Sequence, residues 1–216
     1  DPIEYDLDNI NQAQINAKSG VTFASALKSI LRQDPDIIMV GEVRDEETVE
    51  LGIRAALTGH LVFSTVHTND AASGFTRLLN WNVEPFLIAS TVKGILAQRL
   101  VRRVCKECRQ PYEASEDELR MIGLEPQDSF NAFKGKGCLV CRNTGFKGRI
   151  GIYELLVVDA EISELVLEQA PGYKIREQAR KNGMRTLLED GIIKINRGDT
   201  TISEVYETLG TTKIII

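Results

Sequence analysis

The chain lacks any apolar run long enough to cross a membrane. Its longest apolar stretches are short, such as 37–40 and 61–63, whereas a membrane-spanning helix needs roughly 18 to 20 consecutive apolar residues. No basic segment followed by an apolar one, as in a secretory leader, stands at its start. We therefore expect a cytoplasmic protein with no membrane span of its own.

Positive charge is also scarce. The 216 residues carry 26 lysines and arginines against 31 acidic residues, a net charge of −5, which argues against general nucleic-acid binding. One local exception is a cluster of five cations, Arg99, Arg102, Arg103, Lys106 and Arg109. This cluster predicts a solvated or subunit-facing surface, and a nucleic-acid patch is the alternative.

The first hundred residues alternate helix and strand signals. Thr22 is a good helix N-cap, and the apolar residues after it recur on one helical face until Asp34-Pro35 ends the pattern. The run Ile37–Val40 is wholly apolar, which is typical of a strand buried on both faces. Asp45 can cap the next helix, and Gly59 suits the position after its end.

A second strand and a third helix follow. The segment 61–66 predicts another buried strand, and Asp70 can cap a helix that runs through Leu79. Strands and helices that alternate at short intervals indicate a parallel sheet with helices packed on its faces. The fold class expected is therefore α/β.

The rest of the chain changes character. Residues 101–155 contain all four cysteines, many glycines and little regular periodicity, which indicates a small insert held by something other than an apolar core. Residues 156–209 are expected to be helical. Two capping boxes, at Thr186 with Glu189 and at Thr201 with Glu204, mark helix starts there.

The cysteines form two CxxC pairs that predict a metal site: Cys105, Cys108, Cys138 and Cys141. Two such turns that face each other can place four sulfurs in a tetrahedron, the arrangement of a structural zinc site. The gap between the pairs is longer than usual, but loop closure entropy grows only slowly with length. Two disulfides, a redox motif and a zinc ribbon that binds nucleic acid are the alternatives.

Polar residues follow both expected strands of the first region. Glu42, Arg44 and Asp45 come after one strand, and His67 and Asp70 come after the other. Ligands of open α/β sheets bind beyond the carboxyl ends of the strands. A carboxylate there can orient a water molecule or a magnesium shell, and a histidine can donate to a phosphate oxygen.

These segments, taken in order, resemble the ATPases of type II secretion and type IV pilus assembly. The resemblance rests on Asp1-Pro2-Ile3-Glu4-Tyr5, Leu31–Asp36, Val40–Asp45, Thr58-Gly59-His60 with Ser64–Asp70, Ala97–Leu100, both CxxC pairs and Gly148–Glu154. It covers residues 1 to about 209. It implies a RecA-like parallel sheet core over 1–100, a tetracysteine zinc-binding insert over 101–155 and a C-terminal helical subdomain over 156–216.

The resemblance also implies roles for single residues. Glu42, Glu4 and His67 are implied to be catalytic: Glu42 orients the attacking water and the magnesium shell, Glu4 acts near the γ-phosphate, and His67 senses that phosphate. The residues implied to bind nucleotide are Asp1, Arg32, Arg44, His60 and Arg149. The implied metal ligands of a structural zinc are Cys105, Cys108, Cys138 and Cys141.

One motif of the family is missing. The phosphate-binding loop G-x-x-x-x-G-K-[S/T] should precede the segment at 1–5, and none of the 17 glycines supplies a substitute. The chain as given is therefore expected to bind ATP weakly or not at all, because the backbone nest and lysine that hold the β- and γ-phosphates are absent.

Two functions remain open, because a third, a zinc ribbon that binds nucleic acid through Arg99, Arg102 and Arg103, is disfavoured by the net charge of −5 and by the Glu42 and His67 pattern. The first is the C-terminal part of a hexameric ATPase that uses ATP and magnesium, lies at the inner membrane face and powers a membrane platform for secretion or pilus assembly; its motifs favour secretion only slightly. The second is a non-catalytic, zinc-stapled interaction module of the same machinery. The two hypotheses differ in whether Glu42 is replaceable.

Overall fold

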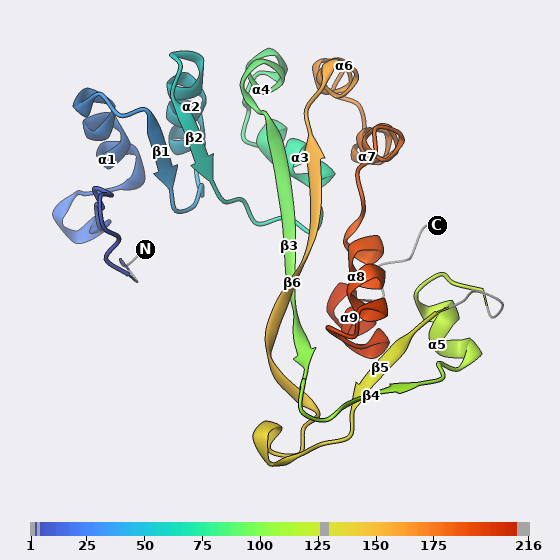
Figure 1. The fold of residues 1–216 in the computed structure, drawn as a ribbon. Helices are drawn as coiled ribbons and strands as arrows, with labels where there is room; N and C mark the ends of the chain where they lie inside the picture. The colour runs from blue at the N-terminus through green and yellow to red at the C-terminus, as the bar shows by residue number, and fades with distance from the viewer. Residues whose placement is uncertain (1–2, 4, 126–129, 211–216) are drawn as a thin grey trace. The chain divides into compact units, whose positions relative to one another are not determined.

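The computed structural model describes residues 3, 5–125 and 130–210, and these divide into two compact units (Figure 1). The first unit contains residues 1–94 and 158–178, and the second contains residues 95–157 and 179–216. Each is described by itself below. The three-part division expected from the sequence stays a prediction.

The first unit is mixed helix and strand. Its elements are η1 (Ala17–Ser19), α1 (Phe23–Ile30), η2 (Leu31–Gln33), β1 (Ile37–Val40), α2 (Glu46–Leu57), β2 (Leu61–Ser64), α3 (Ala72–Asn80), α4 (Pro85–Thr91), α6 (Ala160–Leu167) and the first part of α7 (Gly172–Lys181). The expected helix starts are confirmed. Thr22 caps α1 in a capping box with Ser25, and the Asp45 carboxylate caps α2 by accepting from the Thr48 amide at 2.8 Å.

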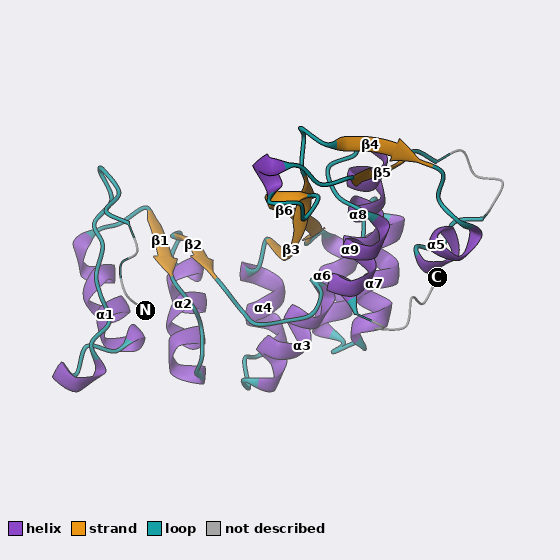
Figure 2. Cartoon of the chain, turned by 90° about the horizontal axis from the view of Figure 1, so that it is seen from below, coloured by secondary structure: helices purple, strands orange, loops and turns teal. Residues whose placement is uncertain are grey.

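Strands β1 and β2 pair in parallel, as expected, with Ile37 opposite Leu61 and Val40 opposite Ser64. Figure 2 shows α1 and α2 beside this strand pair. Ile38 and Val40 are buried in a core with Leu27 of α1 and Ala55 of α2. The sheet face toward these helices is therefore apolar and covered.

The other face of the same pair is not covered in the described residues, so the expectations that β1 is buried on both faces and that β2 is a buried strand are wrong. Four apolar side chains stand on it, 47–72% exposed: Ile37, Met39, Leu61 and Phe63. They share a face because β1 and β2 run in register and side chains alternate along a strand. Strand β2 also ends at Ser64, two residues before the expected end.

The second unit holds longer strands than the sequence suggested. Its elements are β3 (Gly94–Val104), β4 (Arg109–Tyr112), α5 (Glu116–Met121), β5 (Ala132–Gly135), η3 (Leu139–Cys141), β6 (Phe146–Val157), the end of α7, α8 (Leu187–Asn196) and α9 (Ile202–Leu209). Strands β3 and β6 pair and run in opposite directions (Figure 1), and β4 pairs antiparallel with β5. The first residue of β3 belongs to the first unit.

Helices α8 and α9 are tied to the strands by buried carboxylates. Glu154 of β6 is 3% exposed and accepts from the Leu187 amide at the start of α8. Glu204 of α9 is 6% exposed and contacts Arg102 of β3. The Thr186 capping box is complete, whereas at Thr201 only half of the box forms, because the Glu204 carboxylate turns to Arg102 instead.

Three of the five clustered cations are also used inside the second unit. Arg102 pairs with Glu204, Arg103 lies 3.5 Å from an Asp199 carboxylate oxygen, and Arg109 donates to main-chain carbonyls of residues 197 and 198. Much of the positive cluster thus holds the C-terminal segment in place. Among the described residues, no helix is long and apolar enough to span a membrane.

Candidate functional site

The polar residues after β1 and β2 lie together because the two strands are parallel. Residues 40 and 64 are opposite one another, so both loops leave the sheet at the same edge. The Thr65 hydroxyl donates to the Gly41 carbonyl at 2.7 Å, and the Val43 amide donates to the Thr65 carbonyl at 3.1 Å. These two hydrogen bonds hold the loop of Glu42 against the loop of His67.

Glu42 is the buried member of this cluster. Its side chain is 6% exposed, contacts the Arg44 guanidinium in an ion pair, and lies 3.6 Å from the Nε2 atom of His67. The hydrogen bond from Arg44 lowers the pKa of Glu42 below its usual value; burial opposes this shift, and the charge of Arg44 and the His67 contact add to it. Glu42 is therefore a carboxylate at neutral pH.

His67 is the open member. Its side chain is 87% exposed, so one side of the cluster faces solvent. An ionised carboxylate that is fixed by an arginine and faces an exposed imidazole can orient a water molecule and accept its proton, while the imidazole donates to an anionic group. This arrangement suits phosphoryl transfer, which depends on positioning and charge neutralisation.

None of the other predicted nucleotide-binding residues has a described contact with Glu42 or His67. His60 precedes β2, at the opposite end of that strand from His67, and its Nδ1 lies 2.9 Å from the Ala55 carbonyl. Arg32 is exposed in η2, before β1, and Arg149 is exposed on β6 of the second unit. Asp1 and Glu4 lie outside the described residues. The roles of all five residues stay predictions.

Sequence reasoning missed one residue near this site. Arg176 of α7 contacts the carboxylate of Asp70, which closes the loop that carries His67. The two residues are 106 positions apart, and no spacing rule connects them. Only the packing of α7 could have revealed the pair.

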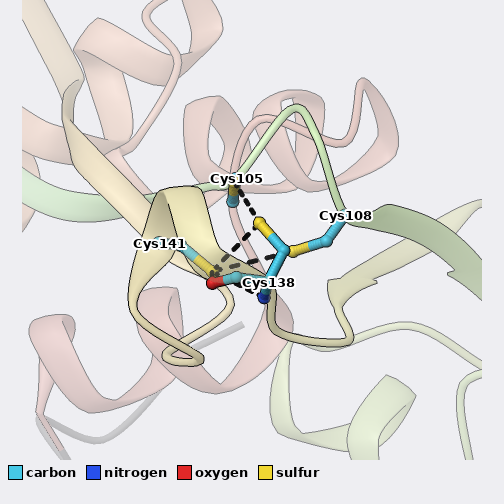
Figure 3. A group of neighbouring side chains, drawn as sticks. All are labelled: Cys105, Cys108, Cys138 and Cys141. Atoms are coloured by element: carbon cyan, nitrogen blue, oxygen red, sulfur yellow. Dashed lines mark hydrogen bonds between the residues drawn. The ribbon is translucent and has the colours of Figure 1, made fainter.

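The four cysteines come together in the second unit, as the CxxC spacing predicted. Figure 3 shows their side chains pointing toward one another, and all four sulfurs lie within 4.8 Å of each other. Neighbouring sulfurs are 3.7–3.8 Å apart. A disulfide needs a sulfur–sulfur distance of about 2.05 Å, and all four residues are free thiols.

These distances fit a zinc ion. Four sulfurs at about 2.3 Å from a central ion form a tetrahedron with edges of about 3.8 Å. The Cys141 sulfur also accepts hydrogen bonds from the Cys138 and Gly145 amides, at 3.2 and 3.3 Å. Such donors support a thiolate, the form that binds metal. The donor set therefore fits a structural zinc, which would link the two CxxC turns.

The pKa values of two thiols differ in a way that agrees with this geometry. Burial raises the pKa of Cys108 to about 12. Burial also acts to raise the pKa of Cys141, but the amide donors and neighbouring thiols outweigh it, and that pKa falls to about 6.

The turns around the cysteines depend on close backbone contact. A Cβ atom added to Gly135 would lie 2.2 Å from the Gly145 carbonyl oxygen. Gly145 itself has φ of +76°, which favours glycine. Glycine at position 135 therefore lets the two backbone segments that flank the Cys138–Cys141 turn approach each other closely.

Comparisons with known proteins point to one family. The family model described as "Type II/IV secretion system protein" matches residues 1–207. The chain is 51% identical over 207 residues to the "Type IV pilus assembly ATPase PilB" of Thermus thermophilus, and 46% identical over 205 residues to "Type II secretion system protein E" of Pseudomonas aeruginosa. These matches cover 95% of this chain but only 23% and 41% of those proteins.

Solved structures agree on the fold. The pilus retraction motor PilT with bound ADP gives a TM-score of 0.61 at 27% identity, over 89% of this chain and 44% of that one. The Legionella pneumophila ATPase DotB gives 0.63 at 24% identity, over 95% of this chain and 48% of that one, which supports the fold alone. The chain therefore has an α/β ATPase fold and belongs to the type II/IV secretion system protein family.

Proposed function

We propose that this chain is the C-terminal portion of a hexameric ATPase that powers type II secretion or type IV pilus assembly at the cytoplasmic face of the inner membrane. The observation that carries the proposal is the cluster at the edge of β1 and β2, where buried Glu42 faces exposed His67. A relative named as an ATPase of pilus assembly and a relative named as a type II secretion system protein support it. Their names do not separate secretion from pilus assembly.

Each residue of the cluster has a role in this proposal. Glu42 orients the attacking water and the shell of a magnesium ion, and Arg44 keeps it ionised. His67 donates to the γ-phosphate. ATP and magnesium supply the reacting phosphoryl group and its charge neutralisation. Arg32, Arg149, His60, Asp1 and Glu4 are proposed to contact nucleotide in the assembled motor.

The cysteine cluster has a structural role in the same proposal. A zinc ion held by Cys105, Cys108, Cys138 and Cys141 has no open coordination position for chemistry when all four thiolates bind it. It staples the CxxC turns beside β3 and β6. Membrane platform components and other copies of the chain are the proposed partners, and nucleic acid is not.

The test is ATP hydrolysis with magnesium in a chimera. The part of the Thermus thermophilus PilB that precedes its matched region is joined to this chain, and turnover is compared with that of the Glu42→Gln variant. We expect Glu42→Gln to lower kcat by about 100-fold or more, the scale of losing one positioned group in a charge-stabilising site. This chain alone should show no turnover, because it has no phosphate-binding loop pattern.

A matched control is Glu50→Gln, which changes an exposed glutamate of α2 that pairs with Arg54. It should leave kcat within about twofold of the unsubstituted chimera. If Glu42→Gln turns over as fast as this control, Glu42 has no catalytic role. The non-catalytic, zinc-stapled interaction module would then be the better account.

A further inference from the structure

The loop that carries His67 is held at both of its ends. At the first end, Thr65 is hydrogen-bonded to the Glu42 loop through the Gly41 carbonyl and the Val43 amide. Between these ends the His67 side chain is 87% accessible. Both ends therefore contribute to the position of His67 beside Glu42.

Asp70 holds the second end through both of its carboxylate oxygens. Oδ1 accepts from the Ser73 amide at 2.8 Å and from the Ser73 hydroxyl at 2.7 Å, which caps α3. Oδ2 contacts the Arg176 guanidinium. The Asp70 side chain is 20% exposed and that of Arg176 is 37% exposed, so water screens this pair only in part.

Arg176 stands on a well-anchored part of α7. The neighbouring Ile175 is 1% exposed, and a Cβ atom added to Gly172 would lie 3.6 Å from the Thr76 hydroxyl of α3. The first residue of α7 thus lies beside α3, the helix that Asp70 caps. An arginine at this position can attract the carboxylate by its positive charge. It can also orient the carboxylate, because its guanidinium is planar and rigid.

We propose that Arg176 is a positioning residue for the Glu42–His67 site: through Asp70 it holds the loop that aims His67, so that α7 sets the geometry of that site. This inference rests on the proposed function, to which it adds a control element in the C-terminal helices. Movement of α7 would release Asp70 and misdirect His67 without touching Glu42.

The first test uses this chain itself. His60 and His67 are its only histidines, so each imidazole can be followed separately by NMR. Arg176→Gln should shift or broaden the His67 signals and leave those of His60 unchanged. Amide hydrogen exchange across residues 66–69 should become about 3- to 10-fold faster, as expected for loss of a partly screened ion pair at a loop end.

Matched variants separate positioning from a general loss of structure. Arg180→Gln removes another ion pair from the same helix, the one to Glu189 at 3.0 Å, and should leave the His67 signals unchanged. Arg176→Lys keeps the positive charge, so its His67 signals should be closer to those of the unsubstituted chain than the signals of Arg176→Gln are. Asp70→Asn should reproduce Arg176→Gln, and the double variant should be no worse than either single one, because both break the same contact.

The second test is the ATPase chimera. Arg176→Gln should lower kcat by about tenfold while KM for ATP stays within about twofold, because a misplaced group costs rate more than binding. Unchanged His67 signals in Arg176→Gln, or equal changes in Arg180→Gln, would overturn the proposal. So would a chimera in which Glu42→Gln abolishes turnover and Arg176→Gln leaves kcat unchanged. Turnover that survives Glu42→Gln refutes the proposed function instead, and the NMR comparison then decides the positioning role alone.

Discussion

Glu42 in the first unit and Glu204 in the second are both buried carboxylates beside an arginine. They are 5% and 6% exposed, and in each case hydrogen bonding to the arginine lowers the pKa of the carboxyl group. The difference lies in what else they contact. Both Glu204 oxygens accept from Arg102, one from its amide and one from its guanidinium, at 2.8 Å. Glu42 instead faces an imidazole that is open to solvent.

This difference separates a carboxylate that holds structure from one that is placed for chemistry. Glu204 joins α9 to β3, and Arg102 also lies over the Phe146 ring at 4.3 Å, so the contact is enclosed on several sides. Glu42 sits at a strand end where ligands of α/β sheets bind. Burial and a lowered pKa are common to both carboxylates and do not distinguish the two roles. The solvent-exposed His67 beside Glu42 does distinguish them.

Metal removal should change amide exchange more than any other perturbation, and the change should be confined to the second unit, which contains the four cysteines. The purified chain is expected to contain about one zinc per chain under reducing conditions, and less than about half an equivalent would contradict the site. A chelator, or Cys138→Ser, should speed amide exchange around Cys105 and in β4 and β5. Residues of β1 and β2 should keep their protection, as hydrogen-exchange mass spectrometry can show. An equal loss of amide protection in both units would mean that metal removal destabilises the whole chain and not the second unit alone.

Glu204→Gln should come next. It removes the charge that Arg102 binds, and we expect the free energy of unfolding to fall by about 2 kcal/mol, the scale for a hydrogen bond to a charged group. Urea unfolding checks this value. Glu207→Gln, an exposed position on the same helix, should change it by no more than about 0.5 kcal/mol. Similar losses in both variants would show that Glu204 has no special holding role.

Lowering the pH should remove the contribution of Glu204 to the free energy of unfolding. Its folded pKa is lowered, first by the hydrogen bond from Arg102 and against burial. Its contribution is therefore fully present above the unfolded pKa of about 4.3, and it is lost as pH falls through the lower folded value. The stability difference between the unsubstituted chain and Glu204→Gln should shrink steadily below about pH 4. A difference that stays constant down to pH 2 would refute the assignment.

The smallest effect is expected at a surface pair. Lys28 of α1 lies 2.7 Å from Glu47 of α2, but the two side chains are 55% and 61% exposed. Solvent screening limits such pairs to roughly 0–1 kcal/mol, so Lys28→Ala should lower the free energy of unfolding by about 0.5 kcal/mol or less. A loss as large as that of Glu204→Gln would mean that burial does not rank these ion pairs.

Local chemistry in the sequence predicted much of the fold. Thr22, Asp45 and Thr186 start helices because their side chains satisfy amides that a helix leaves unpaired, and that need is visible in a few adjacent residues. The CxxC spacing likewise places the sulfurs through local turns. Glu42 and His67 were predictable because parallel strands end at one edge.

What the sequence did not predict depends on contacts between distant segments. Strand β3 was not predicted, because its arginines hide the alternation of buried Ala97 and Val101 with exposed neighbours. Those arginines are matched by residues about a hundred positions later, such as Glu204. The pair of Asp70 and Arg176 was missed for the same reason. No local pattern specifies which distant partner a charge will meet.

The uncovered face of β1 and β2 has a practical consequence for handling the protein. Ile37, Met39, Leu61 and Phe63 form an apolar patch on two short strands, and no other described strand pairs with either one. Open strand edges beside exposed apolar side chains favour self-association. In solution this piece should therefore become turbid as its concentration rises, so kinetic and spectroscopic work on it calls for dilute samples or a solubilising fusion partner.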